Sequence, residues 1–166
     1  MLDVDPNSLK FNFARATVVV IDHNALSLDL LTGILGGFGF RGVHRFTELA
    51  PAVRCARASS ADLILIDPQA FGEEAFDFIR GLRAAPGGQN AKTPVMIVSG
   101  HTSLRMLKQT RDCGADYVIA KPFSTAVLLE RILWVATAES RQPVLIEEEA
   151  PVQFETGPMM AQGAMR

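Results

Sequence analysis

Ala61-Asp-Leu-Ile-Leu-Ile-Asp67 is an apolar run that ends abruptly in a carboxylate and is followed by Pro68-Gln-Ala-Phe-Gly72. A short run of Leu and Ile bounded by polar residues predicts a strand buried on both faces, as in a parallel sheet covered by helices. In open sheets of this kind, ligands bind beyond the carboxyl ends of the strands. From this stretch alone, Asp67 is equally well a reactive carboxylate or a turn residue before Pro68.

Outward from this stretch, the chain alternates between predicted strands and predicted helices. Further apolar strand runs lie at 17–21, 43–46, 94–98 and 117–119, and apolar residues recur at helical spacing over 30–38, 50–58, 76–83, 104–111 and 128–135. We expect Leu30 on the face of the first helix that packs on the sheet. Leu104, Leu107, Lys108 and Arg111 outline the fourth helix, with Thr102 or Ser103 as its cap and Gly114 as its stop. Strand followed by helix, repeated along the chain, predicts an α/β fold with a doubly wound parallel sheet.

Polar residues stand at four of the predicted strand ends, namely Asp22, Asp67, Ser99 and Lys121. Clustered carboxylates suit a hard divalent cation such as Mg²⁺, and a free carboxylate beside it can act as a nucleophile toward phosphorus. Lys121 would offset the charge on phosphoryl oxygens, and the Ser99 hydroxyl could hydrogen-bond one of them. The set therefore predicts a phosphoryl-accepting pocket and favours the reactive interpretation of Asp67.

Composition narrows the class of protein. The 166 residues include 48% hydrophobic and 20% charged residues, which is typical of one globular domain. A net charge of -2 gives no electrostatic footprint for nucleic acid, so we predict no nucleic-acid partner. Cys55 and Cys113 are too few for a disulfide framework or a zinc site, and they are expected to pack as small side chains. Without an apolar run long enough to span a bilayer, a cytoplasmic location with no membrane contact is expected.

Residues 16–138 resemble the receiver domains of two-component response regulators, the CheY-like family. The resemblance rests on Val-Val-Ile-Asp22-His-Asn, on Asp-Leu-Ile-Leu-Ile-Asp67 with Gly72 after it, on Val-Met-Ile-Val-Ser99-Gly100, and on Gly114-Ala-Asp-Tyr-Val-Ile-Ala-Lys121-Pro122-Phe123. It implies a flavodoxin-like fold, (βα)5, with a five-stranded parallel sheet flanked by five helices. It also implies a cis peptide bond before Pro122, a geometry that is available at low energetic cost only before proline.

The same resemblance assigns expected roles to the site residues. Asp67 would be the phosphoacceptor, Ser99 the hydroxyl that follows the phosphoryl group, and Lys121 its ionic partner. Mg²⁺ would be held by Asp22, Asp67 and the backbone carbonyl of Gln69.

Two departures from the family pattern bear directly on the site, and a neighbouring acidic pair has two interpretations. His23 stands where the family has a second acidic residue, which would weaken Mg²⁺ binding; its imidazole either ligates a softer metal or simply faces solvent. Val118 occupies the place of the usual aromatic switch residue, and strand alternation points Tyr117 to the other face of the sheet. Glu73 or Glu74 either restores negative charge near the metal or serves as a partner of the helix dipole.

Both ends of the chain are expected to lie outside the receiver domain. Residues 1–15 contain the turn signal Asp5-Pro6-Asn7 and are interpreted as an extension. Residues 139–166 are too short for an output domain and are rich in proline and acidic residues, which predicts a flexible or partner-binding tail. Val144–Ile146 or Val152–Phe154 could add to a sheet edge as strands.

The leading functional hypothesis is a single-domain response regulator that takes a phosphoryl group from a histidine kinase or a phosphotransfer protein. It would signal to an unidentified protein through the face formed by the fourth helix, fifth strand and fifth helix, with homodimerisation left open. It would not be an enzyme, beyond assisting its own phosphorylation and dephosphorylation. The alternative, favoured by His23 and Val118, is an atypical receiver that works as an interaction module without phosphorylation. A flavodoxin-like cofactor binder or hydrolase is disfavoured, because no glycine-rich phosphate loop follows the first strand.

Overall fold

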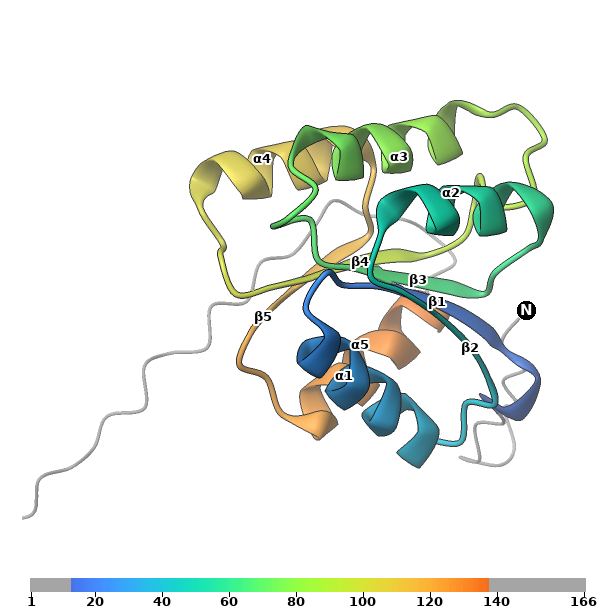
Figure 1. The fold of residues 1–166 in the computed structure, drawn as a ribbon, viewed down its shortest axis with the longest axis vertical. Helices are drawn as coiled ribbons and strands as arrows, with labels where there is room; N and C mark the ends of the chain where they lie inside the picture. Colours follow the sequence, from blue (N-terminus) through green and yellow to red (C-terminus); the bar gives the residue numbers. More distant parts are fainter. Residues whose placement is uncertain (1–12, 138–166) are drawn as a thin grey trace, which may run out of the picture.

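Five parallel strands form one sheet in the order β2-β1-β3-β4-β5 in the computed structural model, which describes residues 13–137 (Figure 1). The strands are β1 (Thr17–Ile21), β2 (Gly42–Phe46), β3 (Leu63–Ile66), β4 (Val95–Ser99) and β5 (Tyr117–Ala120). The helices are α1 (Ala25–Gly37), α2 (Leu49–Ala58), α3 (Glu73–Ala84), α4 (Leu104–Cys113) and α5 (Thr125–Thr137), and a short 3₁₀ helix, η1 (Phe13–Arg15), precedes β1. The predicted α/β, flavodoxin-like (βα)5 fold is thus confirmed.

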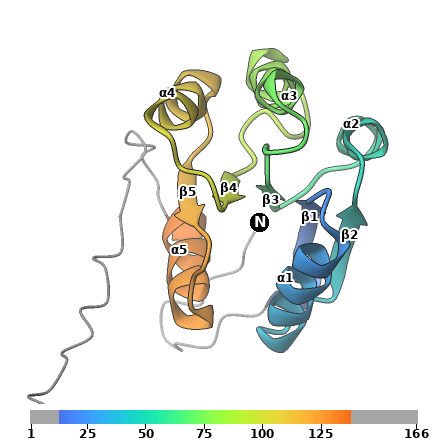
Figure 2. The same ribbon diagram turned by 60° about the vertical axis from the view of Figure 1, so that its left-hand side comes forward.

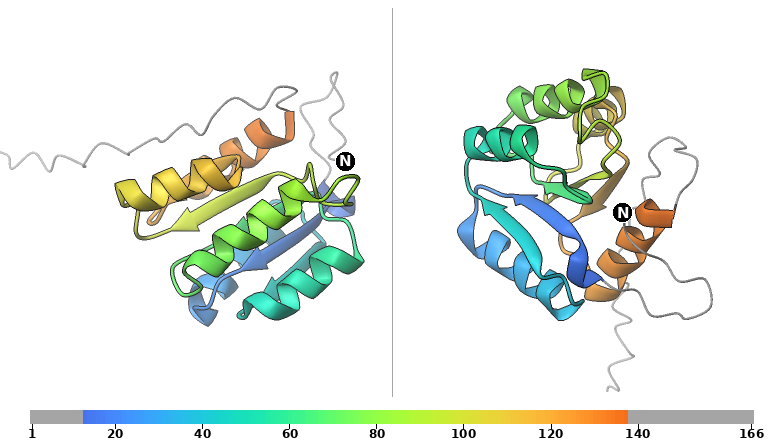
Figure 3. Two further views of the ribbon diagram at one scale, coloured as in Figure 1. Left: turned by 90° about the horizontal axis from the view of Figure 1, so that it is seen from above. Right: turned by 90° about the vertical axis from the view of Figure 1, so that its right-hand side faces the viewer.

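The helices cover the sheet in two layers. Helices α1 and α5 lie on one face, and α2, α3 and α4 lie on the other (Figures 1 and 2). Figure 3 shows the same arrangement from two further directions. Successive strand residues point to opposite faces and so contribute to two separate apolar clusters, with Val18 and Val20 in one and Val19 and Ile21 in the other.

Strand β3 lies at the centre of the sheet, and its burial explains its sequence. All four residues from Leu63 to Ile66 are at most 1% exposed, because β1 and β4 flank them and helices cover both faces. Burying each such side chain contributes roughly 1.5–3 kcal/mol relative to leaving it in water. The apolar run that ends at Asp67 is therefore the buried parallel strand that was predicted.

Polar side chains and glycine define the helix ends. Asn24 caps α1 by accepting hydrogen bonds from the amides of Leu26 and Ser27. Of the two predicted caps for α4, Ser103 is the one used, and its hydroxyl accepts from the amide of Met106. Gly114 ends α4 in the left-handed conformation, at φ 83°, as expected for a helix stop.

The predicted face of α1 was wrong at Leu30, and the leucine that begins α4 is also exposed. Leu30 is 66% exposed and Leu104 is 86% exposed, so neither packs on the sheet. The buried residues are Leu28, Leu31 and Leu35 in α1 and Met106, Thr110 and Cys113 in α4. Thr110 can replace an apolar residue inside because its hydroxyl donates to the carbonyl of Met106, 2.9 Å away, so burial leaves no polar atom unpaired.

Both cysteines lie in the part of the chain that the structure describes. Both cysteines are free, as expected, and burial raises the pKa of the Cys113 thiol.

Phe13 is buried and stacks on Phe40 with 4.4 Å between the ring centroids. The predicted tail strands at 144–146 and 152–154 lie outside the described residues, and the proposed domain boundaries stay predictions. Within residues 13–137, no helix combines the length and apolarity needed to cross a bilayer.

Candidate functional site

Asp22 and Asp67 lie side by side at the carboxyl edge of the sheet. Each directly follows the last residue of a strand, and those residues, Ile21 and Ile66, are paired across β1 and β3. The Asp67 amide also donates to the Ile21 carbonyl at 2.9 Å, which ties the two strand ends together. The chain reverses its winding direction between β1 and β3, and ligands bind at such switch points. Both residues are buried, with Asp22 3% and Asp67 8% exposed.

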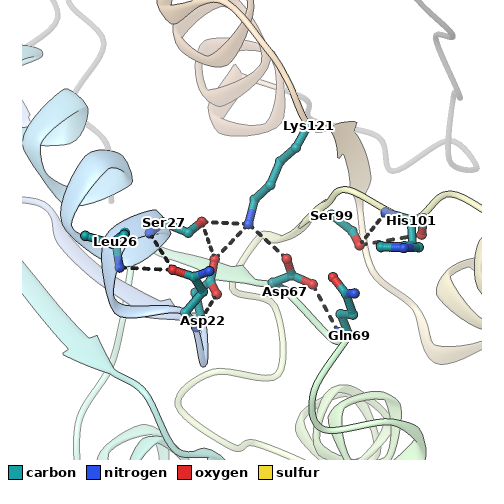
Figure 4. Close-up of polar contacts among 9 residues, drawn as sticks. Asp22, Leu26, Ser27, Asp67, Gln69, Ser99, His101 and Lys121 are labelled. Carbon is teal, nitrogen blue, oxygen red and sulfur yellow. Dashed lines mark hydrogen bonds and ion pairs between the residues drawn. The ribbon is translucent and has the colours of Figure 1, made fainter.

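Lys121 reaches this pair from the end of β5 (Figure 4). Its Nζ lies 2.7 Å from Asp22 Oδ2 and 2.9 Å from Asp67 Oδ2. Its backbone amide donates to the Ser99 carbonyl at 2.8 Å, which fixes the start of the side chain beside β4. The peptide bond between Lys121 and Pro122 is cis, as predicted. The structure thus brings together three of the four strand-end residues, Asp22, Asp67 and Lys121.

Ser27 completes this cluster and was missed by the sequence reasoning. Its Oγ lies 2.6 Å from Asp22 Oδ2 and 2.7 Å from Lys121 Nζ. The residue stands in the first turn of α1, and the segment from Asp22 to Asn24 leads directly from β1 into that turn. A hydroxyl three residues after the cap Asn24 was the only available signal, and it is a weak one because serine is common in a first helical turn.

The contacts set the charge states of the cluster. Burial disfavours the ionised form of Asp22, but hydrogen bonds from Lys121, Ser27 and the Asn24 amide outweigh it, so the pKa of this carboxyl is lowered. Burial likewise disfavours the ammonium of Lys121, but its hydrogen bonds to Asp22 and Asp67 outweigh this effect and raise its pKa. At neutral pH the cluster therefore contains an ionised Asp22 carboxylate and an ammonium.

Ser99 occupies the end of β4 and is 1% exposed. Its hydroxyl accepts from the His101 amide at 3.2 Å and lies 3.5 Å from the His101 carbonyl oxygen, to which it can donate. Within the described part of the chain, these are the hydrogen bonds that the Ser99 side chain makes, and Figure 4 shows them lying apart from Lys121. Ser99 is at the predicted edge, but its hydroxyl is turned toward its own loop.

A cavity of about 560 Å³ opens above the carboxylates. Its lining comprises Asp22, His23, Asn24, Ser27, Asp67, Gln69, Ala70, Gly100, His101 and Lys121. The Gln69 amide donates to Asp67 Oδ1 at 3.0 Å, so the Gln69 backbone lies against the predicted phosphoacceptor. His23 is exposed at the cavity wall.

We tested whether these residues fit a magnesium ion. Mg²⁺ prefers oxygen ligands, keeps several waters, and is usually bound through one or two carboxylates. Asp22 and Asp67 supply two buried carboxylates, and the Gln69 backbone adjoins Asp67. No group of three or more His, Cys, Asp or Glu side chains suited to a metal occurs among residues 13–137. The set fits Mg²⁺ held with few protein ligands and gives no indication of a transition-metal site.

Two further departures from the expected pattern can be located. The Glu73 carboxylate accepts hydrogen bonds from Arg80 in α3 and Gln109 in α4, both at 2.5 Å, so it lies on the surface where these two helices meet. Neither Glu73 nor Glu74 lines the cavity above the carboxylates. Val118 and Tyr117 belong to the apolar clusters on opposite faces of the sheet, as strand alternation predicted.

Comparison with known proteins agrees with this geometry. The family model "Response regulator receiver domain" matches residues 18–133. The DNA-binding response regulator MtrA of Mycobacterium tuberculosis is 31% identical over 120 residues, which is 71% of this chain and 49% of MtrA. The chain thus spans about half the length of the curated relatives it matches.

Solved structures show the same fold. A response regulator from Thermotoga maritima is 26% identical with a TM-score of 0.64, over 74% of this chain and 98% of that protein. The receiver domain of the histidine kinase CKI1 from Arabidopsis thaliana, solved in complex with Mg²⁺, is 22% identical with a TM-score of 0.62, over 71% of this chain and 91% of that domain.

Proposed function

Because the chain belongs to the response regulator receiver domain family of two-component signalling, we propose that its Asp67 accepts a phosphoryl group from a histidine kinase or a phosphotransfer protein. One observation carries the proposal. The Lys121 ammonium lies 2.9 Å from Asp67 Oδ2 and 2.7 Å from Asp22 Oδ2, and all three residues line the cavity that a donor would enter.

The transfer needs little from the protein beyond positioning and charge. A carboxylate oxygen of Asp67 attacks phosphorus, the new O–P bond forms as the P–N bond to the donor histidine breaks, and the imidazole leaves with the bonding electrons and takes up a proton. Lys121 faces the negative charge that spreads over the phosphoryl oxygens. In this role the domain is a phosphoacceptor that assists its own phosphorylation and dephosphorylation, rather than an enzyme acting on other substrates.

Mg²⁺ is the cofactor that the donor set fits, and Asp22, Asp67 and the carbonyl of Gln69 would hold it. The ion would neutralise charge on the phosphoryl group as it transfers. With His23 in place of a second acidic residue, we expect the affinity for Mg²⁺ to be weakened by roughly 1–3 kcal/mol, about tenfold to a hundredfold.

Output is assigned to the face formed by α4, β5 and α5. Leu104, at the start of α4, is 86% exposed. We propose that the phosphorylation state of Asp67 changes how this face binds a protein partner, in the cytoplasm. The Ser99 hydroxyl, held by its own loop in this structure, is the group that would turn toward the phosphoryl oxygens.

Substitution of the acceptor tests the proposal. We expect wild-type protein incubated with Mg²⁺ and a phosphodonor to gain one hydroxylamine-labile phosphate, as an acyl phosphate should. Asp67→Asn should gain none, because an amide is not a nucleophile of this kind. Asp112→Asn, which removes an exposed carboxylate from α4, is the matched control and should label normally. Equal labelling of Asp67→Asn and wild type would rule out Asp67 as the acceptor.

The second candidate is an interaction module that keeps the fold and signals without phosphorylation. It is favoured by His23 at the cavity wall, by Val118 in place of an aromatic residue, and by the Ser99 hydroxyl turned toward His101. The two candidates differ in whether a phosphoryl mimic binds at Asp67.

A further inference from the structure

Ser27, Asp22 and Lys121 form a closed triangle of hydrogen bonds. The Ser27 hydroxyl donates to Asp22 Oδ2 at 2.6 Å, and the Lys121 ammonium donates to the same Oδ2 and to Ser27 Oγ, each at 2.7 Å. Figure 4 shows the Ser27 side chain reaching Lys121 from α1, on the side away from Ser99. The contact joins residues 94 positions apart in the chain.

Counting donors and acceptors shows what this hydroxyl contributes. An ammonium has three protons and no acceptor, and a serine hydroxyl has one proton and two lone pairs. Lys121 donates one hydrogen bond each to Asp22, Ser27 and Asp67. The Ser27 hydroxyl accepts a hydrogen bond from the ammonium and donates one to Asp22, so it bonds to both members of the ion pair.

Ser27 is itself held in place by a rigid element. The Asn24 side chain caps α1 by accepting from the amide of Ser27 at 3.1 Å and from that of Leu26 at 3.0 Å. The backbone amide of Asn24 in turn donates to Asp22 Oδ1 at 2.9 Å. The position of the hydroxyl is thus defined relative to the carboxylates by the helix start, whereas the long lysine side chain has many rotatable bonds and depends on such contacts to fix its ammonium.

We propose that Ser27 is a positioning residue for the phosphoryl transfer: it holds the Lys121 ammonium between Asp22 and Asp67, at the point from which it meets the incoming phosphoryl group. This inference rests on the proposed function of Asp67. Ser27 touches neither the acceptor nor the donor in this scheme and acts through Lys121.

Removing the hydroxyl should loosen the lysine without unfolding the domain. In Ser27→Ala, the ammonium keeps its two carboxylates but loses the bond that anchors it to α1, and one of its protons is left facing the cavity. Ser27→Thr keeps a hydroxyl at the same position, and the residue is only half-buried. Thr32→Ala is the matched control, because it removes a hydroxyl from the same helix whose bonds within residues 13–137 go to the Leu28 and Asp29 carbonyls.

The experiment compares initial rates of labelling by acetyl phosphate at saturating Mg²⁺, together with the ¹⁵Nζ signal of Lys121 in NMR spectra. We expect Ser27→Ala to label on the order of tenfold more slowly, as for the loss of one hydrogen bond to a charged group. We also expect it to lose the Nζ signal, because the ammonium proton that no longer bonds to Ser27 faces the cavity and exchanges rapidly with water. Ser27→Thr and Thr32→Ala should stay within twofold of wild type and keep the signal.

Two results would overturn the inference. One is a wild-type labelling rate in Ser27→Ala, and the other is a slow rate that Ser27→Thr fails to restore, since that would mark a packing effect. A wild-type chain that takes no label contradicts the proposed function instead. In that case an Nζ signal unchanged in Ser27→Ala would separately overturn the claim that Ser27 holds Lys121.

Discussion

Lys121 balances the charge of two buried carboxylates, and most of the electrostatics of the site depends on it. The side chains of Asp22 and Asp67 are 5% and 9% exposed, and that of Lys121 is 24% exposed. A buried pair of this kind adds little net stability, but removing one partner leaves uncompensated charge in a poorly solvated place. The lysine is thus required for stability wherever both carboxylates are ionised.

Lys121→Ala should therefore destabilise the protein. We expect the free energy of unfolding at neutral pH to fall by about 1–3 kcal/mol, below the value for a fully buried pair because the ammonium is partly exposed. Adding Asp67→Asn to this variant should restore part of the loss, because one unpaired carboxylate is removed. Urea unfolding of both variants measures this, and a double variant less stable than Lys121→Ala would contradict the account.

At the residue scale, the sequence predicted side chains at strand ends and missed those on helices. Asp22, Asp67 and Lys121 could be predicted to meet because parallel strands end at one edge of a sheet. Ser27 could not, because its inclusion depends on how α1 leaves that edge. The hydrogen bonds of Ser99 to its own loop depend on backbone geometry that no spacing rule gives.

At the element scale, helices α1 and α4 show how glycine acts differently at a helix end and inside a helix. Gly114 ends α4 at φ 83°, and a Cβ there would lie 3.1 Å from Cγ of Arg83. Gly33 stands inside α1 on its exposed side, with open space where a Cβ would be. The two positions therefore predict opposite responses to the same substitution.

Gly114→Ala should lower the free energy of unfolding by about 1–2 kcal/mol, because a left-handed conformation strains any residue with a Cβ. Gly33→Ala should raise it by about 0.5–1 kcal/mol, since alanine has the higher helix propensity. Thermal unfolding of the two variants makes the comparison. Shifts of the same sign would contradict the helix-end assignment.

The periodicity of the sequence predicted that these helices exist better than it predicted their faces. Leu30 and Leu104 lie at helical spacing with their apolar neighbours and yet are exposed. Contact with the sheet sets the rotation of each helix about its own axis, and in α4 the residue that this contact buries is Thr110 rather than a leucine. Tertiary packing decides between faces that the pattern leaves nearly equivalent.

At the scale of the whole molecule, alternating strands and helices predicted a parallel α/β sheet but not the order of its strands. The order β2-β1-β3-β4-β5 places the ends of β1 and β3 together and leaves β5 two strands away from β3. The length of a lysine side chain closes that gap. The site is thus a property of the sheet as a whole, and its acceptor function is the central claim.

Titration with Mg²⁺ and beryllofluoride, a phosphoryl mimic, tests this claim most directly when followed by amide NMR shifts. We predict that Mg²⁺ alone shifts the amides near Asp22 and Asp67, and that adding beryllofluoride then shifts those of Asp67, Ser99 and Lys121 further in wild-type protein but not in Asp67→Asn. Shifts extending into α4, β5 and α5 would follow from the proposed output face. Wild-type spectra that do not change near Asp67 and Ser99 at any concentration would contradict phosphoryl acceptance and support an interaction module that works without it.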